Sequence, residues 1–267
     1  ENLTILPEQI KSLIKLYSKF DKITLDLVIF HNKQTKKMFL RSKLLTAKET
    51  NVLGSIRMED YLYNLNKKNN GKVISFFSFN KISSIPADLK TSKIDRFKNN
   101  KKGWNKLWDE THIKFFQLAK NNPEKKFIIK TKWGGSWISN IENLWMKKFN
   151  KKSLPNLVLT SDLNTHDIIN QSKLVLAFNS TVLLEAGLRR IPVFVPDFYE
   201  VNTLNKYVLH KYFPECFIKL KNMYHLENAI KDKSLKFFPT KKIMQKRRYF
   251  FKKYVNPLEK NLKSGYF

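Results

Sequence analysis

Five short apolar runs, separated by stretches with helical periodicity, constrain the fold of this chain more than any other feature. The runs are Val73–Phe77, Phe127–Ile129, Leu157–Leu159, Leu174–Phe178 and Val193–Val195. Apolar residues are continuous within each run rather than alternating, which is typical of strands covered on both faces, as in a parallel sheet. The sequence therefore predicts an α/β fold with a Rossmann-like, doubly wound parallel sheet.

Amphipathic segments between the runs supply the connecting helices. The predicted helices are Trp104–Lys120, Ser136–Phe149, Thr165–Gln171 and Thr181–Arg189, with two or three more after Asn222. An apolar share of 42% gives a chain of 267 residues ample material for a packed core. No segment repeats with a period of roughly 20 to 50 residues, so a solenoid is excluded.

The first 66 residues hold too little structure to bury a core alone. Their pattern predicts a helix, a strand, a second helix and a second strand, at Pro7–Phe20, Thr24–Phe30, Thr35–Leu45 and Asn51–Gly54. The chain opens with Glu1 rather than Met. We therefore expect residues 1–66 to be the remnant of an N-terminal domain with its linker, residues 67–250 to form the Rossmann-like domain, and residues 251–267 to form a C-terminal tail helix.

The formal net charge of +29 has two interpretations. Only seven of the 51 basic residues are Arg, a mixture that AT-rich codon usage produces without any binding site. We expect no specific nucleic-acid partner, but the charge favours contact with anionic lipid, at about 1 kcal/mol for each Lys near such a surface. No apolar run approaches the roughly 18 to 20 residues needed to cross a bilayer. The single cysteine, Cys216, fits a reducing cytoplasm, so we expect a cytoplasmic protein with peripheral contact at the inner membrane.

Polar residues follow the predicted strands directly, where an open parallel sheet places its ligand crevice. Ser78 follows the first strand, Lys130 and Lys132 follow the second, and Asn179-Ser180-Thr181 follow the fourth and lead into a helix. Backbone N–H groups at such a helix start bind anions, although Ser or Thr there also serves as an ordinary helix cap. These interpretations are compatible, and both stay open.

Two further loop features bear on a phosphorylated ligand. Lys130 and Lys132 flank Thr131, so in extended backbone both side chains point the same way, as a clamp on a diphosphate requires. Trp133 can either stack on a base or sugar or pack internally. Glu185, one helical turn after the hydroxyls, can accept a hydrogen bond from a ribose or sugar hydroxyl.

Several enzyme classes are excluded by missing motifs. The chain has no P-loop, no G-x-G-x-x-G and no G-x-S-x-G elbow, which argues against P-loop kinases, typical dinucleotide dehydrogenases and α/β-hydrolases. Its histidines lack metal-ligand spacing, so no metal is expected. His166, beside Asp167, lies near the end of the third predicted strand of the sheet.

The chain resembles bacterial glycosyltransferases of GT-B type, most closely the Kdo-transferase-like proteins of capsule and lipopolysaccharide assembly. The resemblance rests on Gly54-Ser55-Ile56-Arg57, on Lys130-Thr131-Lys132, and on NSTVLLEA (179–186) followed by Ile191-Pro192-Val193. It implies a C-terminal donor domain that binds a nucleotide-activated sugar, such as CMP-Kdo, as substrate, without a further cofactor. It also implies a glycan or glycolipid acceptor.

The resemblance assigns donor contacts but no catalytic base, because we expect residues 1–66 to be only the remnant of the acceptor-side domain. The implied donor contacts are Arg57, Ser78, Lys130, Lys132, Asn179, Ser180, Thr181 and Glu185. Two other functions stay open: a polyol-phosphate transferase of the teichoic-acid kind, and a non-catalytic basic protein that binds polyanions or membrane surfaces.

Overall fold

The computed structural model describes residues 7–22, 25–55, 71–85, 103–211, 213, 215–231 and 237–254. The chain divides into two compact units, one comprising Glu1–Asn66 and Lys241–Phe267 and the other Lys67–Thr240. Each unit contains a parallel sheet of its own. No helix among these residues is both long enough and apolar enough to cross a membrane.

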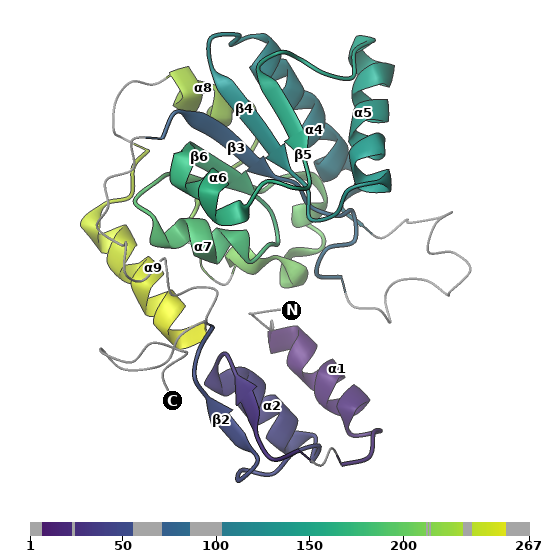
Figure 1. Ribbon diagram of the computed structural model, residues 1–267, viewed down its shortest axis with the longest axis vertical. Coiled ribbons are helices and arrows are strands. Elements are labelled where there is room, and N and C mark those ends of the chain that lie inside the picture. Colours follow the sequence, from purple (N-terminus) through teal and green to yellow (C-terminus); the bar gives the residue numbers. More distant parts are fainter. Residues whose placement is uncertain are drawn as a thin grey trace. The chain divides into compact units, whose positions relative to one another are not determined.

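The larger unit is built on a six-stranded sheet in the order β5-β4-β3-β6-β7-β8, with every neighbouring pair parallel (Figure 1). The strands are β3 (Val73–Phe77), β4 (Lys126–Lys130), β5 (Leu157–Thr160), β6 (Ser172–Ala177), β7 (Val193–Pro196) and β8 (Ile218–Leu220). The chain adds strands on one side of β3 and then on the other, which makes the sheet doubly wound. The predicted α/β fold class is confirmed.

Strand β8 is the one strand of this sheet that the sequence does not predict. It has only three residues, and Lys219 stands at its centre. A strand at the edge of a sheet has a neighbour on one side only, so it does not need a continuous apolar run. The apolar pattern that identifies the inner strands is therefore missing from β8.

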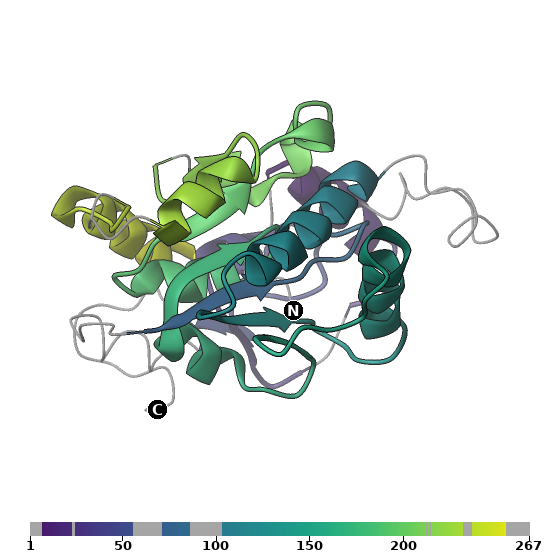
Figure 2. The same cartoon turned by 90° about the horizontal axis from the view of Figure 1, so that it is seen from above.

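Four helices connect these strands, a fifth follows β8, and together they cover both faces of the sheet (Figures 1 and 2). They are α4 (Asn105–Lys120), α5 (Ser136–Phe149), α6 (Thr165–Gln171), α7 (Val182–Leu188) and α8 (Tyr224–Lys231). Helices α4, α5 and α8 contribute to the main core cluster, whereas α6 and α7 contact β3, β6 and β7. The predicted bounds of α5 and α6 agree with the structure at both ends.

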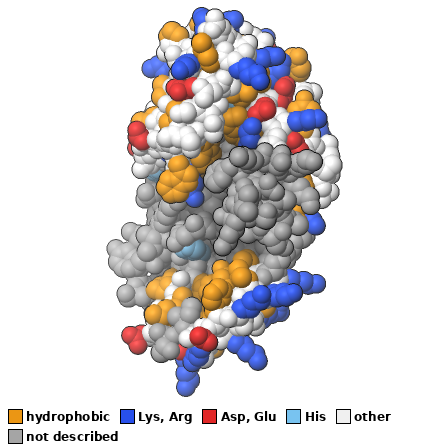
Figure 3. Space-filling model, turned by 90° about the vertical axis from the view of Figure 1, so that its right-hand side faces the viewer, with side chains coloured by type: hydrophobic (Ala, Val, Ile, Leu, Met, Phe, Trp, Pro, Cys, Tyr) orange, Lys and Arg blue, Asp and Glu red, His pale blue; other side chains and the backbone are white. Residues whose placement is uncertain are grey.

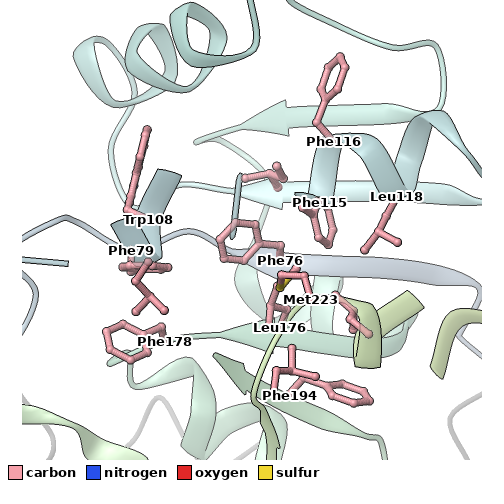
Figure 4. Close-up of a cluster of buried hydrophobic side chains, with 14 of the residues drawn as sticks. Phe76, Phe79, Trp108, Phe115, Phe116, Leu118, Leu176, Phe178, Phe194 and Met223 are labelled. Carbon is pink, nitrogen blue, oxygen red and sulfur yellow. The ribbon is translucent and has the colours of Figure 1, made fainter. Parts of the chain in front are cut away.

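The core of the larger unit lies between the central strands and the α4 layer (Figure 4). Phe76 of β3 packs at an angle against the rings of Phe79, Phe115 and His112. All five residues of β3 are buried, as a strand covered on both faces requires. Burial of each large apolar side chain contributes roughly 1.5 to 3 kcal/mol before conformational entropy is counted.

The smaller unit contains a βαβ arrangement. Strands β1 (Val28–Phe30) and β2 (Thr50–Val52) pair in parallel, α2 (Lys33–Arg41) lies between them in sequence, and the unit also holds α1 (Pro7–Tyr17) and α9 (Lys241–Tyr254). Helix α2 begins two residues before the predicted start because the Asn32 side chain accepts a hydrogen bond from Thr35 N at 2.8 Å. The predicted domain boundary at residue 250 falls inside α9.

Candidate functional site

The carboxyl ends of the parallel strands lie at one edge of the larger sheet, and most predicted donor contacts follow these ends. Ser78 follows β3, Lys130 ends β4, and Asn179 lies two residues beyond β6. Arg57, which was also predicted as a donor contact, lies outside the described residues. The structure thus places three predicted contacts at one edge but gives their side chains different partners.

Asn179 holds the loop after β6 in place. Its Nδ2 donates to the carbonyl of Tyr207 at 3.0 Å, and its Oδ1 accepts from Leu209 N at 2.9 Å. Its backbone has a φ of 47°, in the left-handed region that Asn tolerates better than most residues. Both ends of its amide group are therefore bound to the 3₁₀ segments η3 (Asn205–Tyr207) and η4 (Leu209–Lys211), and Asn179 acts on the site by fixing the loop.

The two hydroxyl residues after Asn179 lie at the start of helix α7. Ser180 Oγ accepts from Val182 N at 3.3 Å, and Thr181 Oγ1 donates to Glu185 Oε1 at 3.5 Å. Ser180 and Thr181 are partly exposed, whereas Glu185 is only 1% exposed. The capping interpretation is therefore observed for Ser180, whose O–H still has a proton that can be donated to a ligand. The Thr181 hydroxyl does not cap the helix, because it donates to Glu185.

Lys130 and Lys132 do not form the predicted clamp in this structure. Lys130 Nζ donates to the carbonyls of Thr131 at 2.8 Å and Ser161 at 2.6 Å, so it braces the ends of β4 and β5. Burial lowers the pKa of Lys130, while the charge of Asp162 acts in the opposite direction. Lys132 is exposed, and its Nζ lies 5.2 Å from the ring centroid of Trp133. The predicted clamp does not form because the Lys130 ammonium group is already bound to two backbone carbonyls.

Trp133 lies on the surface just beyond the end of β4. Its side chain is 65% exposed, so the packing interpretation of this residue is wrong. The next two residues are glycines, and a Cβ on Gly134 would lie 3.1 Å from Ser161 Oγ. Gly135 has a φ of 57° and precedes helix α5. An exposed aromatic ring beside an exposed ammonium group is suited to stacking on a planar or saccharide ring.

Ser78 is part of a buried hydrogen-bond chain rather than an open ligand contact. His112 Nδ1 lies 2.7 Å from the carbonyl of Trp108, so Nδ1 carries the proton and donates. His112 Nε2 then accepts from Ser78 Oγ at 2.9 Å, and the Ser78 oxygen accepts from Trp137 Nε1 at 3.0 Å. Burial lowers the pKa of His112 to about 3, so the ring is neutral.

A cluster around Asp197, directly after β7, was missed by sequence reasoning. Its carboxylate is buried and lies 3.0 Å from His210 Nε2, 2.7 Å from Lys211 Nζ and 2.7 Å from Lys221 Nζ. The hydrogen bond from His210, followed by those from Lys211 and Lys221, lowers the pKa of Asp197 well below its usual range, although burial opposes this. The position of Asp197 after a predicted strand was the one available signal, because its partners come from η4 and from the residue after β8.

A second long-range contact occupies the N-terminus of α4. Glu200, in the 3₁₀ segment η2 (Tyr199–Val201), accepts from Lys106 N at 2.8 Å through Oε1 and from Leu107 N at 3.0 Å through Oε2. A carboxylate there satisfies two N–H groups that the helix itself leaves unpaired and complements the helix dipole.

Within the described ranges, no three His, Cys, Asp or Glu residues are grouped so that they could hold a metal ion.

No protein-family model matches the chain, and no curated protein matches its sequence. Its fold is similar to that of a variant of the wall teichoic acid polymerase TagF, with a TM-score of 0.50 and 14% identity, over 94% of this chain and 57% of that one. Anabaena HepE in complex with UDP-glucose gives a TM-score of 0.45 and 14% identity, over 96% of this chain and 66% of HepE. The S. aureus MnaA structure with UDP gives a TM-score of 0.45 and 14% identity, over 90% of this chain and 57% of MnaA.

The chain thus spans little more than half of the TagF polymerase. At 14% identity the shared property is the fold. The resemblance to Kdo-transferase-like proteins stays a prediction. The comparison and the six-stranded parallel sheet together confirm the Rossmann-like α/β architecture that the sequence predicts.

Proposed function

We propose that this protein binds a nucleotide-activated sugar at the carboxyl edge of its six-stranded sheet and serves its transfer to a surface glycan or glycolipid. The observation that carries the proposal is the loop after β6. The Asn179 side chain fixes this loop by donating one hydrogen bond and accepting another, and the partly exposed Ser180, whose O–H can still donate, follows it directly. A hydroxyl donor in a fixed loop at the carboxyl edge of a doubly wound sheet suits a phosphate group.

The exposed residues after β4 fit the other end of the same ligand. Strand β3 separates β4 from β6, so the loops after β4 and β6 are two strand spacings apart, or about 10 Å. This separation is comparable with the distance between the base and the phosphates of a nucleotide. We therefore assign Trp133 to stacking on the base or sugar, Lys132 to the negative charge of the ligand, and the Ser180 hydroxyl to a phosphate.

The chemistry proposed is group transfer from a phosphate leaving group. Negative charge builds on the nucleotide phosphate as the bond to the sugar breaks, and positioned hydrogen-bond donors and positive charges stabilise that charge. The residues described at the edge supply such donors. The general base that would deprotonate the acceptor hydroxyl is not assigned to any residue of this chain. A CMP-linked sugar is the donor that the resemblance to Kdo-transferase-like proteins favours.

A polyol-phosphate transferase is the second candidate. It is favoured by the similarity in fold to a wall teichoic acid polymerase. Both candidates use a nucleotide-linked donor, so nucleotide binding does not separate them. Product analysis does, because a phosphodiester in the product identifies polyol-phosphate transfer and a glycosidic bond identifies sugar transfer.

We also propose contact with an anionic membrane. Lys and Arg side chains are interspersed with other side chains on the described part of the face in Figure 3, rather than forming one continuous stripe. A charge of +29 still attracts anionic lipid at low salt. Co-sedimentation with phosphatidylserine vesicles at 0.15 M salt tests this contact.

The binding proposal is tested by thermal denaturation with CMP, CDP and UDP. A bound nucleotide stabilises the folded state, so at least one should raise the melting temperature of the wild type. Ser180→Ala combined with Lys132→Ala should abolish the shift. Ser139→Ala is the matched control, because its hydroxyl donates to the Gly135 carbonyl on α5 at 3.2 Å, and it should leave the shift intact. Absence of a shift with every nucleotide would show that the proposal is wrong.

A further inference from the structure

We propose that Lys211 and Lys221, held together by the buried carboxylate of Asp197, form a phosphate-binding pair at the carboxyl ends of β7 and β8. Lys211 Nζ lies 2.7 Å from Oδ1 of Asp197, and Lys221 Nζ lies 2.7 Å from Oδ2. One ammonium group is thus fixed on each oxygen of a single carboxylate. The inference rests on the proposed function only for the identity of the phosphate, which would belong to the nucleotide donor.

The backbone explains why these two lysines meet. Asp197 follows the last residue of β7, and its N–H donates to the Leu220 carbonyl at 2.8 Å. The pairing of β7 with β8 therefore continues to the very end of both strands. Lys221 comes directly after Leu220, so it emerges beside Asp197, and Lys211 ends the 3₁₀ segment η4 that carries His210.

The cluster carries an excess of positive charge. His210 donates through Nε2 to Asp197, so in the neutral ring the other nitrogen, Nδ1, carries no proton and has a free lone pair. Nδ1 is buried and has no hydrogen-bond partner among the described residues. A second proton would create an unpaired buried N–H, which is costly, and burial accordingly lowers the pKa of His210. One carboxylate and two ammonium groups then leave one net positive charge.

The two ammonium groups also remain accessible. The side chains of Lys211 and Lys221 are 29% and 63% exposed, whereas that of Asp197 is 0% exposed. Each ammonium has three N–H donors, and Asp197 accepts one from each, so further donors face outward. A structural ion pair needs only one cation for one carboxylate. Two cations fixed in advance lose little conformational freedom when they bind an anion.

The pair lies beside the loop proposed to bind the donor phosphate. Leu209 N donates to Asn179 Oδ1 at 2.9 Å, and Lys211 is two residues beyond Leu209. Ser180 is the residue after Asn179, so one hydrogen bond links the hydroxyl loop to the segment that carries Lys211. Charge-assisted hydrogen bonds from Lys to phosphate are about twice as strong as neutral ones, so the pair would add substantially to a hydroxyl-only site.

The test uses isothermal titration with inorganic pyrophosphate and with CDP, at 0.15 M salt. Lys211→Ala with Lys221→Ala should weaken pyrophosphate binding by at least about tenfold, as expected for two lost charge-assisted contacts. The matched control is Lys120→Ala with Lys126→Ala. These are exposed lysines at the end of α4 and the start of β4, at the opposite edge of the sheet. The control removes the same charge and should change affinity by less than about twofold.

Lys221→Ala alone guards against a folding defect, because this side chain is 63% exposed. It should weaken binding measurably while leaving the melting temperature unchanged. Equal affinity in the wild type, in Lys221→Ala and in the double variant would overturn the lysine pair, even if CDP binds. Pyrophosphate binding that depends on the pair, without any nucleotide binding, would support the pair and overturn the proposed function. Binding of neither probe would overturn both.

Discussion

His210 Nε2 lies 3.0 Å from Asp197 Oδ1, and neither side chain is exposed to solvent. The pair connects the end of β7 to η4, segments that local sequence patterns do not bring together. A buried carboxylate is tolerated only when positive charges or hydrogen-bond donors surround it. Asp197 has three such partners. Its removal should therefore lower the free energy of unfolding more than removal of an exposed carboxylate does.

Replacing Asp197 with Ala should lower the free energy of unfolding by about 3 kcal/mol, because the change breaks a buried ion pair. Equilibrium unfolding in urea measures the loss. Asp109→Ala is the matched control, since Asp109 pairs with Lys81 at 2.9 Å and both side chains are 39% to 45% exposed. The control should cost no more than about 1 kcal/mol. Equal losses in the two variants would contradict a buried, charge-compensated Asp197.

Stability should fall as the pH is lowered from about 6.5. The pKa of His112 is about 3 in the folded protein, against 6.5 for the unfolded chain. Between these values the unfolded state binds the proton and the folded state does not, so acid favours unfolding. The slope is about 1.4 kcal/mol for each pH unit. Burial also lowers the pKa of His210, which adds a change in the same direction.

Unfolding curves at pH 7, 6 and 5 measure this slope. The ring C–H resonance of His112, followed by NMR, gives the residue-specific check. It should stay at the position of the neutral ring throughout that range. A His112 resonance that titrates near pH 6.5 would show that the Ser78–His112–Trp108 chain does not hold the ring neutral.

Replacing Glu200 with Gln should destabilise the larger unit by about 1 to 2 kcal/mol. The substitution keeps the side-chain shape but leaves one acceptor oxygen for two N–H groups and removes the charge at the start of α4. Hydrogen exchange of the Lys106 and Leu107 amides should accelerate. Glu227→Gln breaks only the exposed pair with Lys231 and should cost about 0.5 kcal/mol or less. Unchanged exchange at Lys106 and Leu107 would mean that Glu200 does not cap α4.

Gly71→Ala should disturb the junction of β3 and β6. A Cβ at residue 71 would lie 2.3 Å from the carbonyl carbon of Ser172 and 2.4 Å from its oxygen, so the backbone must shift. We expect a loss of about 3 kcal/mol, or a fall in melting temperature of about 6 to 12 °C. Gly134→Ala meets only the Ser161 side chain, with Oγ at 3.1 Å and Cβ at 3.8 Å, and should cost less than half as much. A Gly71→Ala protein that melts with the wild type would contradict this packing.

Trp133 should report ligand binding by fluorescence. Its ring is 65% exposed, whereas Trp104, Trp108 and Trp145 are buried. The fifth tryptophan, Trp137, is half-buried, and its Nε1 donates to Ser78 Oγ at 3.0 Å. A base or sugar ring that stacks on Trp133 should therefore change mainly the Trp133 emission. Trp133→Phe keeps a stacking surface and should retain nucleotide affinity, while Trp133→Ala should weaken it roughly fivefold or more. Tyr224→Ala removes another exposed aromatic, with Lys114 Nζ 5.3 Å from its ring, and should change nothing. Equal affinity in Trp133→Ala and the wild type would remove Trp133 from the site.

The sequence by itself determined the elements whose signals are local. Continuous apolar runs identified β3 and the other inner strands because side chains on both faces of those strands are buried. Helix α5 was predicted at both ends, and the structure places Gly135 and Asn150, both with positive φ, at its two caps. These signals lie within a few residues of the feature they specify, so they can be read before the chain folds.

Only the tertiary structure decided which predicted side chains are open to a ligand. Asn179, Lys130 and Ser78 were all predicted as donor contacts, and each is bound instead to a group that its own strand or helix does not contain. The Asp197 cluster and the Glu200 cap were missed for the same reason, since Glu200 reaches amides 93 and 94 residues away. Hydrogen bonds and ion pairs depend on distances in space, and a sequence pattern specifies such distances only within one element.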